Sequence, residues 1–231
     1  MKNAQDAEQT AIREVFALKN VRVFFTKFGR MKFVSHLDMN RFMIRVLYKS
    51  GLPIWFTEGF NPHPYLTFAL PLSLGFESEY EIMDIRVNDD ELSFEEIKEK
   101  ISAVCPPYIR IFKVAEPVLK SGKVAFAEFK ISFDTDDEKF FDALKEFLSR
   151  DSVICSKTTK KGKIKEIDII PKIVKWDISD NILKITLPAG SEDNVNPTLI
   201  LDAFFEEAKT NFYCYDIIRT KIMDNSMNLF V

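Results

Sequence analysis

The chain has 231 residues, a net charge of −3 and 46% hydrophobic residues, 22 of them phenylalanine. This composition can bury a large core, which excludes a disordered protein, and the acidic balance means that any polyanion site has to be a local patch. The first twenty residues lack the continuous apolar segment of a signal peptide, and no run of about 18 apolar residues follows. We therefore expect a cytoplasmic protein that does not enter a membrane.

Cysteine and histidine usage argues against a metal site or a disulfide framework. The three cysteines, Cys105, Cys155 and Cys214, are too far apart for a zinc knuckle, an iron–sulfur ligand run or a set of disulfides. The chain has only two histidines, which excludes a histidine-rich metal site. We expect buried reduced thiols, no metal and no cofactor.

The first predicted elements are a strand at residues 21–28 and a helix at His36–Ser50. Ser35 offers an N-cap oxygen, and the acidic side chain of Asp38 meets the positive end of the helix. Gly51 and the proline two residues later end the helix. Its apolar positions repeat at helical spacing: Met39, Met43, Val46 and Leu47.

The order of predicted elements repeats along the chain. Extended runs follow at 66–70 and 80–87, then a helix at 94–104 and a strand at 108–114. The second half has strands at 124–133, 153–156, 164–170, 173–177, 182–187 and Tyr215–Met223, and helices at 138–149 and 198–209. We predict an α+β protein of two tandem ferredoxin-like (β-α-β-β-α-β) units. The units span 18–116 and 123–231, after a flexible or helical N-terminal extension at 1–17.

The stretch FTEGFNPHPYLTFALPLSLG at 56–75 encloses His63 between two prolines. Pro62 and Pro64 each hold φ near about −65° and push the residue before them, Asn61 or His63, into extended geometry. The loop is therefore expected to be stiff, and Gly59 relaxes the steric limits where the chain enters the turn. His63 is either a loop ring held by backbone hydrogen bonds or a residue that contacts a ligand.

The other histidine, His36, falls in the first turn of the first helix. The helix dipole is positive there, which raises the cost of charging the imidazole and keeps it neutral. A neutral ring suits a general base, and the alternative is a ring that packs under the proline loop.

Basic residues gather on and before this helix. Arg41, Arg45 and Lys49 lie at i, i+4 and i+8 and therefore share one helix face. Three more cations precede the helix: Lys27, Arg30 and Lys32. The face is either the solvated side of an amphipathic helix or a local surface that meets phosphates.

A second basic run occupies a predicted hairpin tip in SKTTKKGKIKEIDIIP. Its lysines are Lys157, Lys160, Lys161, Lys163 and Lys165. They either keep an exposed strand edge soluble or grip RNA without base specificity.

The stretch that runs from VRVFFTKFGRMKFVSHLDMNRFM to GFNPHPYLTFALPLSLGFES resembles the radical-SAM-linked bacterial domain of unknown function (DUF2344-like). KGKIKEIDIIP and YDIIRT are similar to that family's second-half motifs. The resemblance covers residues 18–223 and implies a radical S-adenosylmethionine protein as the partner. The chain lacks the three-cysteine motif that holds the cluster of such an enzyme, so it is expected to act as an accessory half.

The tandem fold is also similar to the RAMP endoribonucleases that process CRISPR repeats, in which a histidine near the first helix promotes metal-independent cleavage. This RAMP-like interpretation rests on the similarity of the predicted folds alone. The glycine-rich C-terminal loop of those proteins is missing here, and LPAGSEDNV is a poor substitute.

Three functions stay open. The leading hypothesis is an accessory module, without catalysis of its own, that binds RNA such as tRNA or rRNA or presents a substrate to the radical S-adenosylmethionine protein. The second is a metal-independent ribonuclease or RNA-modifying enzyme with His36 and His63 as base and acid. The third is a protein–protein adaptor that does not touch nucleic acid.

We expect both histidines to form one site, with Phe60 and Tyr65 burying the loop against the first helix. A stiff loop opposed to a helix N-terminus offers a preorganised anion site. The residues expected to shape it are Ser35, Asp38, Gly59, Phe60, Asn61, Pro62 and Pro64.

Overall fold

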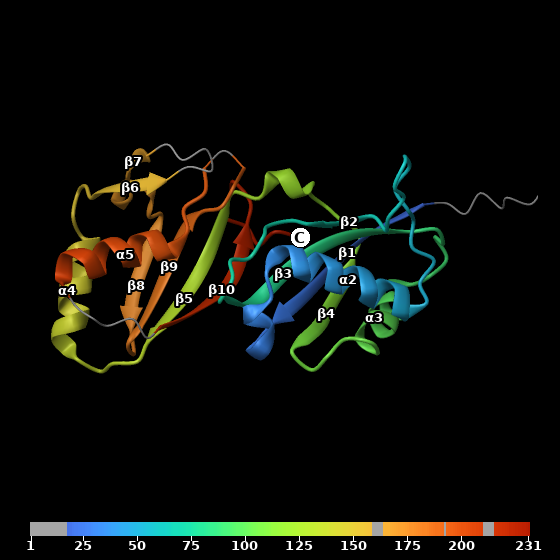
Figure 1. Ribbon diagram of the computed structural model, residues 1–231, viewed down its shortest axis with the longest axis horizontal. Coiled ribbons are helices and arrows are strands. Elements are labelled where there is room, and N and C mark those ends of the chain that lie inside the picture. Colours follow the sequence, from blue (N-terminus) through green and yellow to red (C-terminus); the bar gives the residue numbers. More distant parts are fainter. Residues whose placement is uncertain (1–17, 159–163, 192, 210–214) are drawn as a thin grey trace, which may run out of the picture.

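A computed structural model describes residues 18–158, 164–191, 193–209 and 215–231. These residues form an α+β fold in which helices pack against one large mixed sheet (Figure 1). Its eight strands are β1 (Lys19–Lys27), β2 (Leu66–Phe68), β3 (Glu77–Val87), β4 (Ile109–Ala115), β5 (Phe126–Phe133), β8 (Lys175–Ser179), β9 (Ile182–Pro188) and β10 (Tyr215–Met223). The helices are α2 (His36–Ser50), α3 (Phe94–Ser102), α4 (Glu138–Leu148) and α5 (Pro197–Ala208), and β6 (Ile154–Thr158) pairs with β7 (Ile164–Asp168) in a separate small sheet. The predicted α+β class is confirmed.

One sheet runs through both halves of the chain. The strands of the first half lie in the order β4-β1-β3, with β2 paired to β3, and those of the second half lie in the order β10-β5-β9-β8. Neighbours within each half are antiparallel. β3 and β10 run parallel and join the halves, with Arg219 opposite Ser78. The division into two ferredoxin-like units, with boundaries at 18–116 and 123–231, stays a prediction.

The predicted helix α2 is confirmed from its first residue to its last. The hydroxyl of Ser35 accepts a hydrogen bond from the backbone N–H of Asp38, which satisfies a free donor of the first turn. Gly51 adopts a left-handed φ of 69° and ends the helix. The predicted apolar stripe is buried: Met39, Met43, Val46 and Leu47. Apolar spacing and end signals therefore specify this element.

The two faces of β1 belong to two different cores, because successive strand residues point to opposite faces. Val21, Val23 and Phe25 pack with the buried side chains of α2 and α3. Phe24 belongs instead to the core that contains α4, α5 and Phe230. The face of the first-half strands that points away from α2 is therefore not covered by α2 or α3. The segment that links the halves and the C-terminal residues can pack on it.

Candidate nucleic-acid interface

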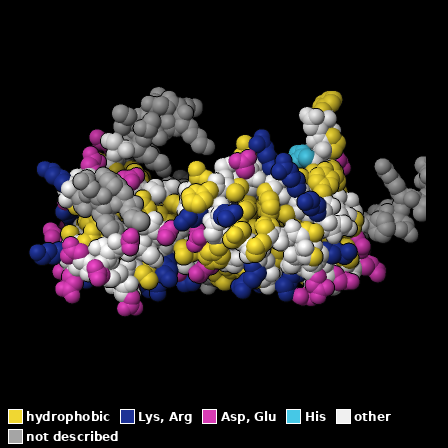
Figure 2. All heavy atoms as spheres, turned by 60° about the horizontal axis from the view of Figure 1, so that its bottom comes forward, with side chains coloured by type: hydrophobic (Ala, Val, Ile, Leu, Met, Phe, Trp, Pro, Cys, Tyr) yellow, Lys and Arg dark blue, Asp and Glu magenta, His cyan; other side chains and the backbone are white. Residues whose placement is uncertain are grey.

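The outer face of α2 carries the predicted row of cations. Arg41, Arg45 and Lys49 are exposed, and Figure 2 shows Lys and Arg side chains gathered in a band over α2. Arg41 makes an exposed contact of 3.3 Å with Asp38, which holds it weakly. Arg45 and Lys49 have no ion-pair partner among the described residues. All three charges are available to a polyanion.

Exposed aromatic rings lie beside these cations. Tyr48 lies one helical turn beyond Arg45, is 58% exposed, and its ring centroid is 5.9 Å from that of Phe56. Phe60, at the tip of the proline loop, is fully exposed. The expectation that Phe60 is buried against the first helix is therefore wrong, because the loop extends away from the helix. We call the whole set the basic–aromatic strip: Arg41, Arg45, Tyr48, Lys49, Phe56 and Phe60.

The proline loop is ordered by its own hydrogen bonds. The backbone N–H of Thr57 donates to the carbonyl of His63 at 2.8 Å, and the Tyr65 N–H donates to the Trp55 carbonyl at 3.0 Å. Gly59 has a φ of 127°, a backbone angle that residues with a side chain rarely adopt. These contacts make the loop a narrow projection at the C-terminal end of α2 (Figure 1).

The ring of His63 is held within this loop. Its Nδ1 lies 3.1 Å from the carbonyl oxygen of Asn61 and 3.1 Å from Oγ1 of Thr57. A carbonyl oxygen only accepts, so Nδ1 is the donor in the first contact and Nε2 carries no proton in the neutral ring. In this exposed residue, Nε2 is therefore a hydrogen-bond acceptor.

His36 is held at the other end of α2. Its ring meets that of Phe68 edge-on at 5.2 Å. Burial lowers its pKa, the charges of Lys27 and Arg219 lower it further, and Glu81 opposes them. The lowered pKa agrees in direction with the predicted neutral ring of His36. Its main cause is burial rather than the helix end.

Among the described residues, no ring-contact or hydrogen-bond partner of His36 is also a partner of His63. The loop reaches α2 through Tyr48, twelve residues after His36, and a helix rises about 1.5 Å per residue, or about 18 Å over that span. The contacts therefore do not favour the expected single site, and they do not favour a base and an acid acting on one scissile group.

A buried charge cluster lies beneath the N-terminal end of α2. Lys27, expected at the surface, is 2% exposed, and its ammonium donates to the carbonyl of Val34 at 3.2 Å. Arg219 is 1% exposed and pairs with Glu81, which is 3% exposed. The RNA-binding role expected for Lys27 is therefore corrected, because its strand neighbours and the junction with β10 cover it.

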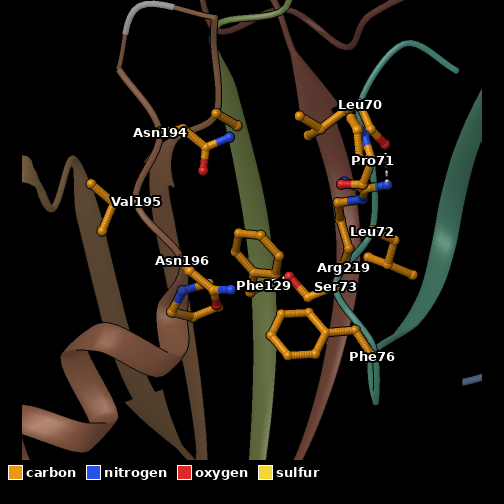
Figure 3. Close-up of a pocket in the computed structure, with 12 residues that line it drawn as sticks. Leu70, Pro71, Leu72, Ser73, Phe76, Phe129, Asn194, Val195, Asn196 and Arg219 are labelled. Atoms are coloured by element: carbon orange, nitrogen blue, oxygen red, sulfur yellow. Dashed lines mark hydrogen bonds between the residues drawn. The ribbon is translucent and has the colours of Figure 1, made fainter. Parts of the chain in front are cut away.

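Arg219 also fastens the junction of the two halves. Its guanidinium donates to the backbone carbonyls of Leu70 at 3.0 Å and Pro71 at 3.2 Å (Figure 3). Asn196, the N-cap residue of α5, donates to the hydroxyl of Ser73 at 3.0 Å across the same junction. The pocket between these segments has a volume of about 40 Å³, which is too small for a substrate. We therefore interpret this region as structural.

The remaining predicted residues fall into two groups. Lys32 pairs with Asp216 of β10 at 2.7 Å, whereas Arg30 is exposed. The hairpin lysines lie outside the residues whose side chains the structure describes: Lys157, Lys160, Lys161, Lys163 and Lys165. Cys214 and the extension at 1–17 also lie outside the described residues.

Cys105 and Cys155 are free and half-buried rather than fully buried. Burial raises the pKa of the Cys105 thiol to about 11, which disfavours the reactive thiolate. Within the described residues, no three His, Cys, Asp or Glu side chains are grouped as metal ligands. None of the described helices is both long enough and apolar enough to cross a membrane.

We expect His36 to titrate below its ordinary pKa of 6.5, since partial burial disfavours the charged ring. The folded state then binds the proton less well than the unfolded state. Stability is accordingly expected to decline as the pH falls below 6.5 and through the folded-state pKa. NMR titration of the imidazole Cε1–H, assigned with His36→Gln, measures the midpoint. A midpoint at or above 6.5 contradicts the prediction.

In a comparison with known protein families, residues 20–197 match one family model. The family is described as "Uncharacterized protein conserved in bacteria (DUF2344)". No curated protein matches the sequence. The acetolactate synthase small subunit from Thermotoga maritima is 12% identical over 90% of this chain and 97% of that chain, with a TM-score of 0.23. An "Unknown Protein" from Galdieria sulphuraria is 10% identical over 87% of this chain and 96% of that chain, with a TM-score of 0.26. TM-scores at this level carry no argument about fold or function.

Proposed function

The chain belongs to this bacterial family, and we propose that it is an accessory module that binds single-stranded RNA in the cytoplasm and works with a radical S-adenosylmethionine protein. The basic–aromatic strip is the observation that supports RNA binding. Single-stranded nucleic acids bind where cations follow the backbone and aromatic rings stack on bases. The strip combines both on one side of α2.

The strip is suited to affinity more than to sequence selection. Arg41, Arg45 and Lys49 repeat every four residues, or about 6 Å along the helix, close to the spacing of successive phosphates in an extended strand. Tyr48 and Phe60 present faces that any base can stack on, worth about 1–3 kcal/mol per base. A radical S-adenosylmethionine partner would then supply the reaction and its specificity.

The proposal of a radical S-adenosylmethionine partner rests on the motif resemblance alone, so it needs a test of its own. Co-purification from native cells, followed by identification of the bound proteins and RNA, examines it. Recovery of a radical S-adenosylmethionine protein supports the partnership, and its repeated absence from RNA-containing complexes argues against it.

We also propose that each half is a ferredoxin-like unit. In the first half β4-β1-β3-β2 and in the second half β10-β5-β9-β8 follow the same antiparallel order, with β6 and β7 as an insertion in the second unit. Expression of 18–116 and 123–231 as separate chains, with hydrogen exchange as the readout, tests this division.

Replacing Arg41, Arg45 and Lys49 together by Ala is expected to weaken binding of a labelled oligouridylate. Each phosphate contact to a single strand contributes about 0.7 to the slope of log K against log salt, so the slope is expected to fall by about 2. Fluorescence anisotropy at several salt concentrations measures it. The matched control replaces three exposed cations outside the strip, Lys100, Arg110 and Lys175, by Ala.

The aromatic rings give a separate readout. Tyr48→Ala with Phe60→Ala is expected to lower affinity about ten-fold or more while leaving the salt slope unchanged, because stacking releases no counterions. If the wild-type protein does not bind at low salt, or if the control triple variant loses as much slope as the strip variant, the proposal fails.

The adaptor function remains a second candidate because of one apolar area. Phe33 is 70% exposed, Leu37 is 61% exposed and Leu74 is 61% exposed. The backbone N–H of Gly75 donates to the carbonyl of Lys32, which brings the segment of Leu74 beside Phe33. Charged replacements of Phe33 and Leu37 that abolish partner recovery but retain oligouridylate binding would favour this function.

A further inference from the structure

A groove of about 550 Å³ lies on the face of the first-half strands opposite α2. Arg22 of β1 and Asp84 and Arg86 of β3 alternate with residues of the α2 core and therefore point to this face. The linking segment at 116–121 forms one wall, and Tyr65 and Thr67, which follow the proline loop, form another. The volume is in the range of sites for small molecules.

Arg86 is the unusual residue of the groove. Its guanidinium carbon lies 4.5 Å from the ring centroid of Tyr65 and 5.1 Å from that of Trp55. These two rings also pack on each other edge-on at 5.9 Å. The two rings therefore lie on neighbouring sides of the guanidinium rather than on its two faces, and its hydrogen bonds form in its own plane.

The side-chain N–H groups of Arg86 have no hydrogen-bond partner among the described residues. Nε of Arg86 is buried without a hydrogen bond, and the described ion pairs do not include Arg86. Leaving a charged donor unsatisfied is costly. Nε of Arg219 is also buried without a partner, but the pocket beside it has a volume of only about 40 Å³, whereas Arg86 lines a groove of about 550 Å³ that has room for a ligand.

The carboxylates nearby do not supply the partner. Both oxygens of Asp84 accept from Arg22, at 2.7 Å each, and one also accepts from the Ser121 hydroxyl at 2.8 Å. The groove holds three cations, Arg22, Arg86 and Lys120, and two carboxylates, Asp84 and Glu116, a net charge of +1. A single oxyanion therefore complements it.

We propose that this groove binds a small ligand through a carboxylate or phosphate group held by Arg86. A guanidinium fits such a group through two parallel hydrogen bonds. Lys120, Asn20 and Thr67 line the same space and provide further donors. The site is independent of the basic–aromatic strip, because Tyr65 and Trp55 line or support the groove, whereas Phe56 contacts Tyr48 on the α2 side.

The two tryptophans of the chain make the site measurable. In a Trp176→Phe background Trp55 is the only tryptophan, and its ring touches Arg86. Titration with inorganic phosphate, and separately with sodium acetate, at constant ionic strength held with sodium chloride, is expected to change Trp55 fluorescence with saturation. For probes of this size the dissociation constant is expected on the order of 1–10 mM. The probe that saturates at the lower concentration identifies the oxyanion.

Two variants separate the site from general charge effects. Arg86→Gln is expected to weaken binding at least ten-fold, and Lys120→Gln, which leaves the stacked rings in place, about two- to five-fold. Arg110→Gln is the matched control and is expected to have no effect. The Arg86 Nε–H resonance, assigned by its loss in Arg86→Gln, gives a second readout in the wild-type chain. Saturation of both signals supports the site; an Nε–H resonance that neither anion shifts, or equal binding by Arg86→Gln, overturns it.

Discussion

Glu81→Gln is expected to destabilise the folded protein by about 3–5 kcal/mol, the usual effect of removing one partner of a buried ion pair. Glu81 is the carboxylate that faces Arg219, and both residues are almost completely buried. Lys27 lies in the same cluster, and burial already lowers its pKa while Glu81 is the cause that raises it. Without this carboxylate, two buried cations face each other, so the pKa of Lys27 is expected to fall further.

Urea unfolding followed by circular dichroism measures this loss. Glu79→Gln is the matched control, because Glu79 is exposed on the same strand, and it is expected to change stability by no more than about 0.5 kcal/mol. Glu81→Leu combined with Arg219→Met is expected to recover part of the stability, since an apolar pair carries no desolvation cost, whereas the carbonyls of Leu70 and Pro71 lose their donor. Equal effects of Glu81→Gln and Glu79→Gln would show that the cluster does not stabilise the junction.

Local signals in the sequence were sufficient to predict α2. The Ser35 cap, the apolar stripe and Gly51 act over a few residues, and the structure retains all three. The same holds for β10, predicted with its observed bounds. Such elements are predictable because their determinants are close in sequence.

The environment of Lys27 was not predictable in this way. Its sequence neighbours, Arg30 and Lys32, suggest a surface cluster, but Ser78 of β3 lies between Lys27 and Arg219 of β10 in the sheet. Burial thus depends on a parallel strand pair formed by residues far apart along the chain. Periodicity within β1 contains no information about that pairing.

The candidate site was predicted in part. The i, i+4, i+8 spacing identified Arg41, Arg45 and Lys49, and it also places Tyr48 on nearly the same face, a signal that could have been used. The outward position of Phe60 depends on hydrogen bonds that narrow the loop. Arg86 was not predicted, because its stacking requires the base of the loop to pack across β3.

The second large effect is expected at Arg22, which joins three distant segments on the open face of the sheet. Arg22 is fully buried and donates to both oxygens of Asp84, to the Leu119 carbonyl at 2.8 Å and to the Val231 carbonyl at 2.9 Å. Its guanidinium also lies 4.9 Å from the ring centroid of Phe230. It therefore fixes the linking segment and the C-terminal residues against β1 and β3.

Arg22→Met is accordingly expected to cost about 3–5 kcal/mol, because a methionine fills the space but leaves two backbone carbonyls without a donor and Asp84 without its cation, with only the Ser121 hydroxyl donating to it. Arg22→Met combined with Asp84→Leu removes the unpaired carboxylate and is expected to restore part of the stability, whereas the two carbonyls stay unsatisfied. Urea unfolding measures the loss, and hydrogen exchange at 116–121 is expected to accelerate more than exchange in α4 and α5. A loss spread evenly over the whole chain, with no recovery in the double variant, would mean that Arg22 acts through packing alone.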